Sequence, residues 1–167
     1  MPSETNITMA VRKTWESKFK VGQVAPEFNT TLHNGAILDS HTLKGKPVIL
    51  FFYNTDGTET CTKEACNIRD NYKALTEAGY QVFGVSKDSE RKHRNFIQKY
   101  NLPYPLISDK DNILAKTFDI FGEKHFMGRV SNAVHRTTFV IDKEWKFAQV
   151  IHPVLSSDHA SQILGGT

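Results

Sequence analysis

The sequence predicts a single α/β domain in which a mixed sheet is flanked by helices. Residues 46–53 (KPVILFFY) are almost continuously apolar and rich in β-forming residues, as in a strand buried on both faces. After this run, segments with helical periodicity alternate with short β-like segments. A chain of 167 residues is also long enough to bury one hydrophobic core without disulfides.

The N-terminal part is expected to contribute an extension and a hairpin. Residues 1–20 are too polar to fold alone, so we expect an extension that lies on a domain formed by residues 21–167. Asn34-Gly35 is a typical two-residue turn, and it predicts a hairpin between short alternating segments. The buried strand at 46–53 follows.

The remaining elements are predicted from periodicity and end signals. Apolar residues at helical spacing predict a helix over 58–79 that Gly79 ends. A strand (80–86), an amphipathic helix (89–102), a strand (104–109) and a short helix (112–120), capped by Asp109 or Asp111, come next. A hairpin (136–142 and 146–152) and a last helix (156–164) complete the order β-β-β-α-β-α-β-α-β-β-α.

Composition excludes several classes of function. The net charge of +3 is small and unclustered, which argues against nucleic acid and membrane surfaces as partners. No run approaches the ~20 apolar residues of a membrane span, and the N-terminus has no apolar stretch typical of a secretory signal. Two cysteines are too few for a disulfide scaffold, and the seven histidines are scattered, so no metal site is expected. We expect a cytoplasmic protein.

Both cysteines lie in one stretch, TETCTKEAC, at the start of a predicted helix. Thr58 or Thr60 can cap this helix, which places Cys61 in the first turn, where the helix dipole favours thiolate. Cys66 follows five residues later, so a wound helix holds the two α-carbons roughly 8 to 9 Å apart. A disulfide needs them within about 7 Å. The pair is therefore either structural or a redox switch that requires unwinding, and the two cysteines alone leave both open.

The surrounding segments resemble the Q-type peroxiredoxins, also called bacterioferritin comigratory proteins. The likeness covers residues 21–152 and includes VGQVAPEFNTTLHNGAILDSHTLKGKPVILFFY, TETCTKEACNIRD, VFGVSKDSERKHRNFIQKYNLPYPLISD and HRTTFVID. It implies a thioredoxin-like fold and reduction of hydrogen peroxide and alkyl hydroperoxides without a metal or organic cofactor. It also implies that Cys61 is the peroxidatic cysteine and that Cys66 resolves it through an intrachain disulfide.

The resemblance extends to the active-site pattern P-x-x-x-(T/S)-x-x-C, which falls on NTDGTETC. It implies that Thr58 orients the peroxide and that Arg136, in HRTTFVID, stabilises the thiolate and the charge on the leaving oxygen. The pattern's proline is Asn54 here, and the family's common Pro-Gly before the cysteine is Glu59-Thr60. We expect Glu59 to oppose thiolate formation and the altered loop to slow catalysis or change its substrate.

Other functions use the same cysteines. A general thiol–disulfide oxidoreductase would carry a C-x-x-C motif and a proline before the strand predicted at 136–142. This chain has C-x4-C instead, and Thr137 stands at the start of that strand. A redox sensor or oxidation-triggered chaperone differs from an enzyme only in turnover. We expect a peroxidase reduced by thioredoxin or a similar thiol reductant, and a monomer, because the intrachain pair needs no second subunit.

Overall fold

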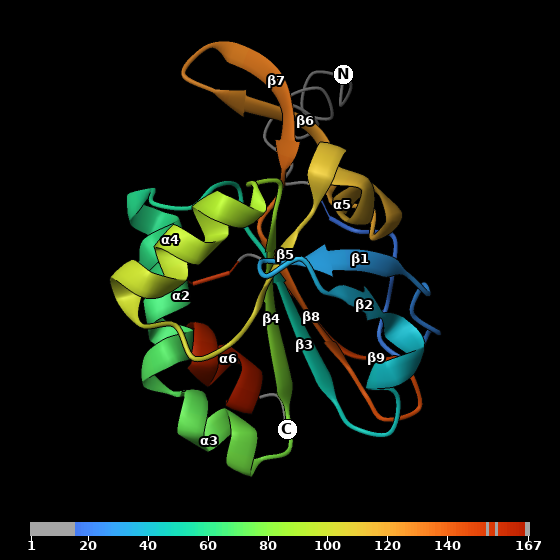
Figure 1. Ribbon diagram of the computed structural model, residues 1–167. Coiled ribbons are helices and arrows are strands. Elements are labelled where there is room, and N and C mark those ends of the chain that lie inside the picture. Colours follow the sequence, from blue (N-terminus) through green and yellow to red (C-terminus); the bar gives the residue numbers. More distant parts are fainter. Residues whose placement is uncertain (1–15, 153, 156, 166–167) are drawn as a thin grey trace, which may run out of the picture.

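A mixed sheet of seven strands forms the centre of the protein in a computed structural model that describes residues 16–152, 154–155 and 157–165 (Figure 1). The strand order is β2-β1-β5-β4-β3-β8-β9, in which β3, β4 and β5 run parallel to one another and the remaining pairs are antiparallel. The mixed sheet predicted from the sequence is confirmed. Its strands are β1 (Asn29–Leu32), β2 (Ile37–Asp39), β3 (Val48–Phe52), β4 (Gln81–Ser86), β5 (Leu106–Ser108), β8 (Thr137–Ile141) and β9 (Phe147–Ile151).

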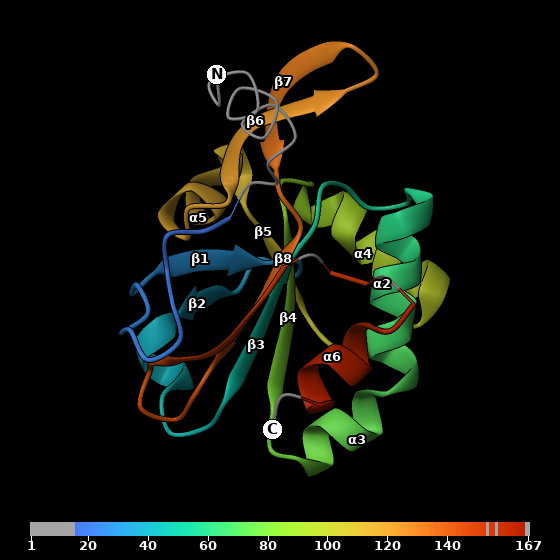
Figure 2. The ribbon, with the colours of Figure 1, turned by 180° about the vertical axis from the view of Figure 1, so that it is seen from behind.

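Helices cover both faces of this sheet (Figures 1 and 2). One face carries α2 (Glu59–Asp70), α3 (Tyr72–Glu77), α4 (Glu90–Tyr100) and α6 (His159–Gly165), and the other carries α5 (Ile113–Thr117). Two short 3-10 helices, η1 (Ser40–Leu43) and η2 (Lys110–Asn112), join strands to the following elements. Within the described ranges, no helix has the length and apolar character needed to cross a membrane.

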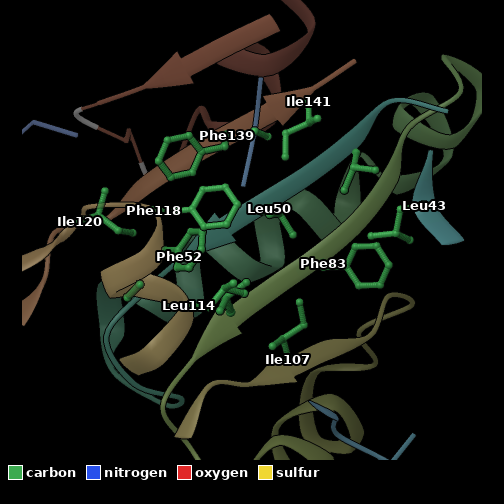
Figure 3. Packing of buried hydrophobic residues seen from close by; sticks show 14 of the residues in the cluster. Leu43, Leu50, Phe52, Phe83, Ile107, Leu114, Phe118, Ile120, Phe139 and Ile141 are labelled. Carbon is green, nitrogen blue, oxygen red and sulfur yellow. The ribbon is translucent and has the colours of Figure 1, made fainter. Parts of the chain in front are cut away.

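Two buried hydrophobic clusters hold these layers together, one on each face of the sheet. Alternate residues of β3 enter different clusters because successive side chains of a strand point to opposite faces. Leu50 and Phe52 join the cluster beneath α5, which Figure 3 shows, while Phe51 and Tyr53 join the cluster beneath α2, α3, α4 and α6, called here the helical-face cluster. All five residues of β3 are buried, as expected for a strand covered on both faces.

Local end signals in the sequence are confirmed where the chain turns. Gly35 has φ +86° between β1 and β2, and Gly79 has φ +95° after α3, conformations that glycine adopts without strain. The carboxylate of Asp109 accepts hydrogen bonds from the backbone N–H groups of Leu114 and Ala115 at 2.8 and 3.0 Å. Asp109 therefore stabilises the start of α5, as predicted.

The single helix predicted over 58–79 is wrong, because the structure divides it into α2 and α3 at Asn71. This residue has φ −110° and ψ 11°, outside the helical range. Its side-chain amide donates to the carbonyl oxygen of Asn67 at 2.8 Å, a local bond with which asparagine competes against helix propagation. Periodicity continues across the break because the apolar residues on both sides face the same cluster.

A second hairpin, β6 (Phe121–Phe126) with β7 (Arg129–Val134), was not predicted. It extends away from the main sheet at the top of Figure 1. Its turn is formed by Met127 and Gly128, with φ 51° and 78°. Two-residue turns of this kind favour asparagine or glycine at both positions, so a methionine conceals the signal.

The expected N-terminal extension lies largely outside the described residues, which begin at residue 16. The part that is described contacts the domain. The Ser17 hydroxyl donates to the carbonyl oxygen of Phe118 at 2.7 Å, and the ring of Phe19 lies 5.3 Å from that of Phe147. Residues 16–20 therefore pack against the cluster beneath α5.

Gly84 in the middle of β4 is expected to tolerate no side chain. A Cβ atom there would lie 2.7 Å from Leu106 Cδ2 and 2.7 Å from Phe51 Cζ, and both residues are fully buried. We expect Gly84→Ala to lower the free energy of unfolding by roughly 1–3 kcal/mol, because a packed core cannot accommodate an added methyl group without displacing its neighbours. Urea unfolding measures this. Gly165→Ala is the control, since a Cβ there meets no described atom within 4 Å; equal unfolding midpoints for the two variants would contradict the prediction.

Candidate active site

The first turn of α2 holds the first of the two cysteines. Strand β3 ends at Phe52, residues 53–58 turn the chain, and Thr58 occupies the N-cap position with extended backbone angles. Cys61 lies in the first turn, as predicted, where backbone N–H groups have no partner within the helix. Its side chain is 3% exposed and packs in the helical-face cluster.

Thr58 is the N-cap residue of α2, but its hydroxyl does not bond to a backbone N–H of the helix. It donates instead to the carbonyl oxygen of Thr55 at 3.4 Å, which is a long hydrogen bond. The residue is exposed. Its hydroxyl therefore lies beside the start of the helix, where it remains able to contact a bound molecule.

Cys66 lies in the second half of the same helix and is half-buried. Burial raises the pKa of the Cys66 thiol, while the Arg69 guanidinium opposes part of this effect. Both cysteines are free thiols within one continuous helix, as the spacing predicts. A bond between them therefore requires α2 to change conformation.

Arg136 reaches α2 through a buried carboxyl group. It immediately precedes β8, and its Nη1 atom lies 3.6 Å from Oε2 of Glu64, which is three residues after Cys61 in α2. The Arg136 side chain is 28% exposed, whereas that of Glu64 is fully buried. Residues three apart on a helix share a face. The guanidinium therefore lies on the side of α2 that carries Cys61.

Glu64 is a site residue that sequence reasoning missed. Burial raises the pKa of its carboxyl group to about 8, although Arg136 partly opposes the shift. His159 of α6 lies on its other side, with Nδ1 3.8 Å from Oε1, and burial lowers the pKa of this imidazole to about 3. A charged residue between Cys61 and Ala65, on the face of α2 that is otherwise apolar, was the signal in the sequence.

Lys124 on β6 adds a second cation near the site. Burial and the Arg136 guanidinium lower the pKa of its ammonium group, while the Cys61 thiolate acts in the opposite direction. At the base of the hairpin, the ring Nε2 of His135 lies 3.0 Å from the carbonyl oxygen of Glu123. The β6–β7 hairpin thus brings positive charge to Cys61, and nothing in the sequence pattern marked it.

A buried network fixes the loop that precedes α2. The Tyr53 hydroxyl donates to Asp56 Oδ1 at 2.5 Å, and Nδ1 of His93 in α4 lies 2.7 Å from Asp56 Oδ2. Asp88, which follows β4, accepts hydrogen bonds from the Asp56 backbone N–H at 2.7 Å and from the Thr55 hydroxyl at 2.8 Å. The loop that carries Thr58 is therefore bonded to the β4–α4 connection.

The same network contains the group with metal-like spacing in the described part of the chain, Asp56, Asp88 and His93. Its polar atoms already have partners, since His93 Nε2 also lies 2.9 Å from the carbonyl oxygen of Ile107. The ammonium group of Lys92 lies 3.0 Å from Asp88 Oδ1 and occupies the position of a cation. The arrangement fits a structural network.

Two of the departures from the family pattern face solvent. Glu59 is 84% exposed and its carboxylate lies 3.3 Å from the Lys63 ammonium one turn later. Its charge is thus partly neutralised and screened by water, which weakens the expected opposition to the thiolate. Thr60 is also exposed, while Asn54, two residues after β3, is half-buried.

Comparison with known proteins agrees with this geometry. Residues 21–150 match the model of the AhpC/TSA family, which is most of the chain. A Coxiella burnetii relative, named as a peroxiredoxin Bcp, is 43% identical over 146 residues that cover 87% of this chain and 97% of that protein. The chain belongs to the AhpC/TSA family, among the Bcp or Q-type peroxiredoxins. Peroxiredoxin Bcp of Bacillus subtilis is 36% identical over 87% of this chain and 92% of its own length.

Solved peroxiredoxin structures share the fold. BcpB of Mycobacterium tuberculosis matches with a TM-score of 0.78 at 33% identity, covering 89% of this chain and 96% of that one. Peroxiredoxin Q of Xanthomonas campestris matches with a TM-score of 0.80 at 28% identity, covering 89% and 94%. The thioredoxin-like fold and the peroxidase class expected from the sequence are confirmed. This peroxiredoxin is an enzyme that acts on peroxides with thiol reductants.

Proposed function

We propose that this peroxiredoxin reduces hydrogen peroxide and alkyl hydroperoxides with Cys61 as nucleophile and Cys66 as resolving thiol. The observation that carries the proposal is the arrangement of α2. It holds Cys61 in its first turn and Cys66 in its second half, with Arg136 against the same helix. Thioredoxin or a similar dithiol is the proposed reductant. A cytoplasmic monomer is the proposed form, because the chemistry needs free thiols and no second subunit.

The first step is attack of the Cys61 thiolate on the nearer oxygen of the peroxide. The O–O bond breaks, Cys61 becomes a sulfenic acid, and the leaving hydroxide or alkoxide takes a proton to give water or an alcohol. In this proposal the hydroxyl of Thr58, at the start of the helix, orients the peroxide; its long bond to the Thr55 carbonyl oxygen supports this role, because such a bond is easily exchanged. The guanidinium of Arg136 stabilises first the thiolate and then the charge on the leaving oxygen.

The second step is attack of the Cys66 thiolate on the Cys61 sulfur. This forms the disulfide and expels hydroxide, which leaves as water with the proton that Cys66 gave up. Two thiols of the reductant then restore both cysteines. Peroxide consumption with thioredoxin, thioredoxin reductase and NADPH tests the scheme: an enzyme consumes many equivalents of peroxide per chain. A redox sensor or oxidation-triggered chaperone would stop after one equivalent, which would overturn the proposal.

One equivalent of peroxide is expected to form the Cys61–Cys66 disulfide and to unwind the first turns of α2. The reason is geometric, since a wound helix keeps the two cysteines beyond bonding reach. Hydrogen exchange of residues 60–70 should therefore show less protection in the oxidised form than in the reduced form. Cys66→Ser is the control, in which Cys61 should stop at sulfenic acid and α2 should stay protected. Equal protection in both forms, with the disulfide confirmed by mass spectrometry, would rule out unwinding.

A further inference from the structure

Glu64 lies between the two cysteines in α2, yet its carboxyl group is buried without a hydrogen-bond partner. Its side chain is 0% exposed, and neither Oε atom has a partner within the described residues. A buried polar group without such bonds loses solvation that it would have in water. The segment that must unwind for the disulfide to form therefore contains a group that gains solvation when it is exposed.

The groups around Glu64 give its carboxyl group one long ion pair and no hydrogen bond. Arg136 faces it from the start of β8 at 3.6 Å, beyond hydrogen-bond distance, and His159 faces it from α6 at 3.8 Å. Tyr104, which donates its hydroxyl proton to the carbonyl oxygen of Ala65, is the titratable group on the side of β5. From β6, the Lys124 ammonium group is close enough to Arg136 for their two positive charges to repel each other.

The surroundings favour the neutral carboxylic acid in the wound helix. Burial raises the pKa of Glu64 to about 8, and the single guanidinium opposes this without cancelling it. Burial also lowers the pKa of His159 to about 3, so this imidazole is uncharged at neutral pH and supplies no counter-charge. With Glu64 neutral, the positive charge of Arg136 is not neutralised by the Glu64 carboxyl group.

We propose that Glu64 links proton release to the unwinding of α2: its carboxyl group holds a proton while the helix is wound and gives it to water when residues 61–66 open. This rests on the proposed function, in which unwinding precedes disulfide formation. The neutral acid preserves the Arg136 charge for the thiolate in the reduced form. Opening the helix solvates and ionises the carboxyl group, which favours the resolving step over rewinding.

The direction of the pH effect follows from the two states of Glu64. In the unwound segment its pKa returns to the ordinary value near 4.5, while in the wound helix it is about 8. Between these values the wound form binds one more proton than the unwound form. The population of the unwound form therefore rises about tenfold for each unit of pH in this window and levels off above it.

Hydrogen exchange of the reduced protein tests this without any peroxide chemistry. Protection factors of residues 61–68, each corrected for the intrinsic exchange rate, should fall by about tenfold per pH unit from pH 5.5 to 7 in the wild type and level off above pH 8. In Glu64→Gln they should be independent of pH. Glu77→Gln is the matched control, an exposed glutamate of α3, and should follow the wild type. A wild-type slope that survives in Glu64→Gln would overturn the proposal.

A second measurement serves if Glu64→Gln fails to fold. Infrared difference spectra of the reduced wild-type protein should show the carbonyl band of a protonated, buried carboxyl group at pH 7 and its loss by pH 9. Absence of that band at pH 7 would overturn the proposal. Failure of the proposed function would be seen in a different measurement. No intrachain disulfide would form after peroxide treatment, whatever the pH dependence of hydrogen exchange in the reduced helix.

Discussion

Cys61→Ser is expected to abolish peroxide consumption while leaving the fold intact. A serine hydroxyl is not ionised near neutral pH, so the variant lacks the nucleophile proposed to attack the O–O bond. The oxygen replaces sulfur at a position that is 3% exposed, in the first turn of α2, without changing the backbone. The rate with thioredoxin, its reductase and NADPH should fall to that of the mixture without enzyme.

The other cysteine provides the matched control for this variant. Cys66→Ser should retain the first oxidation but lose turnover with thioredoxin. A single-turnover assay, in which each chain consumes one peroxide, detects the first oxidation. Circular dichroism should give the same helix content for both variants as for the wild type. Substantial thiol-dependent turnover by Cys61→Ser would show that a different group attacks the peroxide.

Arg136→Met is expected to lower kcat/KM for peroxide by about 100-fold or more, the usual effect of removing one charge-stabilising donor at a transition state. The guanidinium lies 3.6 Å from Glu64, one turn after Cys61. In the proposed mechanism, the thiolate and the leaving oxygen then both lose the charge of this guanidinium. A second result follows, because alkylation of Cys61 should then require higher pH.

Arg129→Met is the control for this prediction. Arg129 belongs to the exposed part of β7, a few residues before Arg136 on the same chain segment, and its loss removes the same charge from the protein. Its kcat/KM should match the wild type. If Arg136→Met keeps both the rate and the pH dependence of alkylation, the guanidinium does not act on Cys61 and the role inferred from the family pattern is wrong.

The sequence predicts the layers of this fold well because its signals there are strong and local. The apolar run that becomes β3 predicts a buried strand by itself, and the glycines at 35 and 79 predict turns because they adopt positive φ without strain. The β6–β7 hairpin was missed because Met127 occupies a left-handed turn position, and the break at Asn71 because a side-chain amide decides it. Neither feature changes the pattern of apolar residues.

The candidate site also contains residues that the sequence reveals and residues that only tertiary packing brings together. Cys61 and Cys66 stand out through their scarcity, whereas Glu64 and His159 act through burial that only the packing of α2 against α6 creates. Lys124 reaches the site from a hairpin that the sequence did not reveal. Asp56 and His93 lie 37 residues apart, and their contact depends on the placement of α4 against the loop before α2. Such long-range pairs have no signature within either segment.

Three hydrogen bonds join the second half of α2 to the rest of the molecule, and they oppose any unwinding that spreads along the helix. Asn67 donates its side-chain amide to the carbonyl oxygen of Ser157 and accepts from the backbone N–H of Ala160, both at 2.8 Å. Tyr104 holds the carbonyl oxygen of Ala65 at 2.7 Å. The two bonds of Asn67 fasten the helix beyond Cys66 to α6 and the residues just before it, whereas the Tyr104 bond joins the residue before Cys66 to the segment before β5. If oxidation unwinds the first turns of α2 as proposed, the contact with the C-terminal helix limits how much of α2 a reductase can reach.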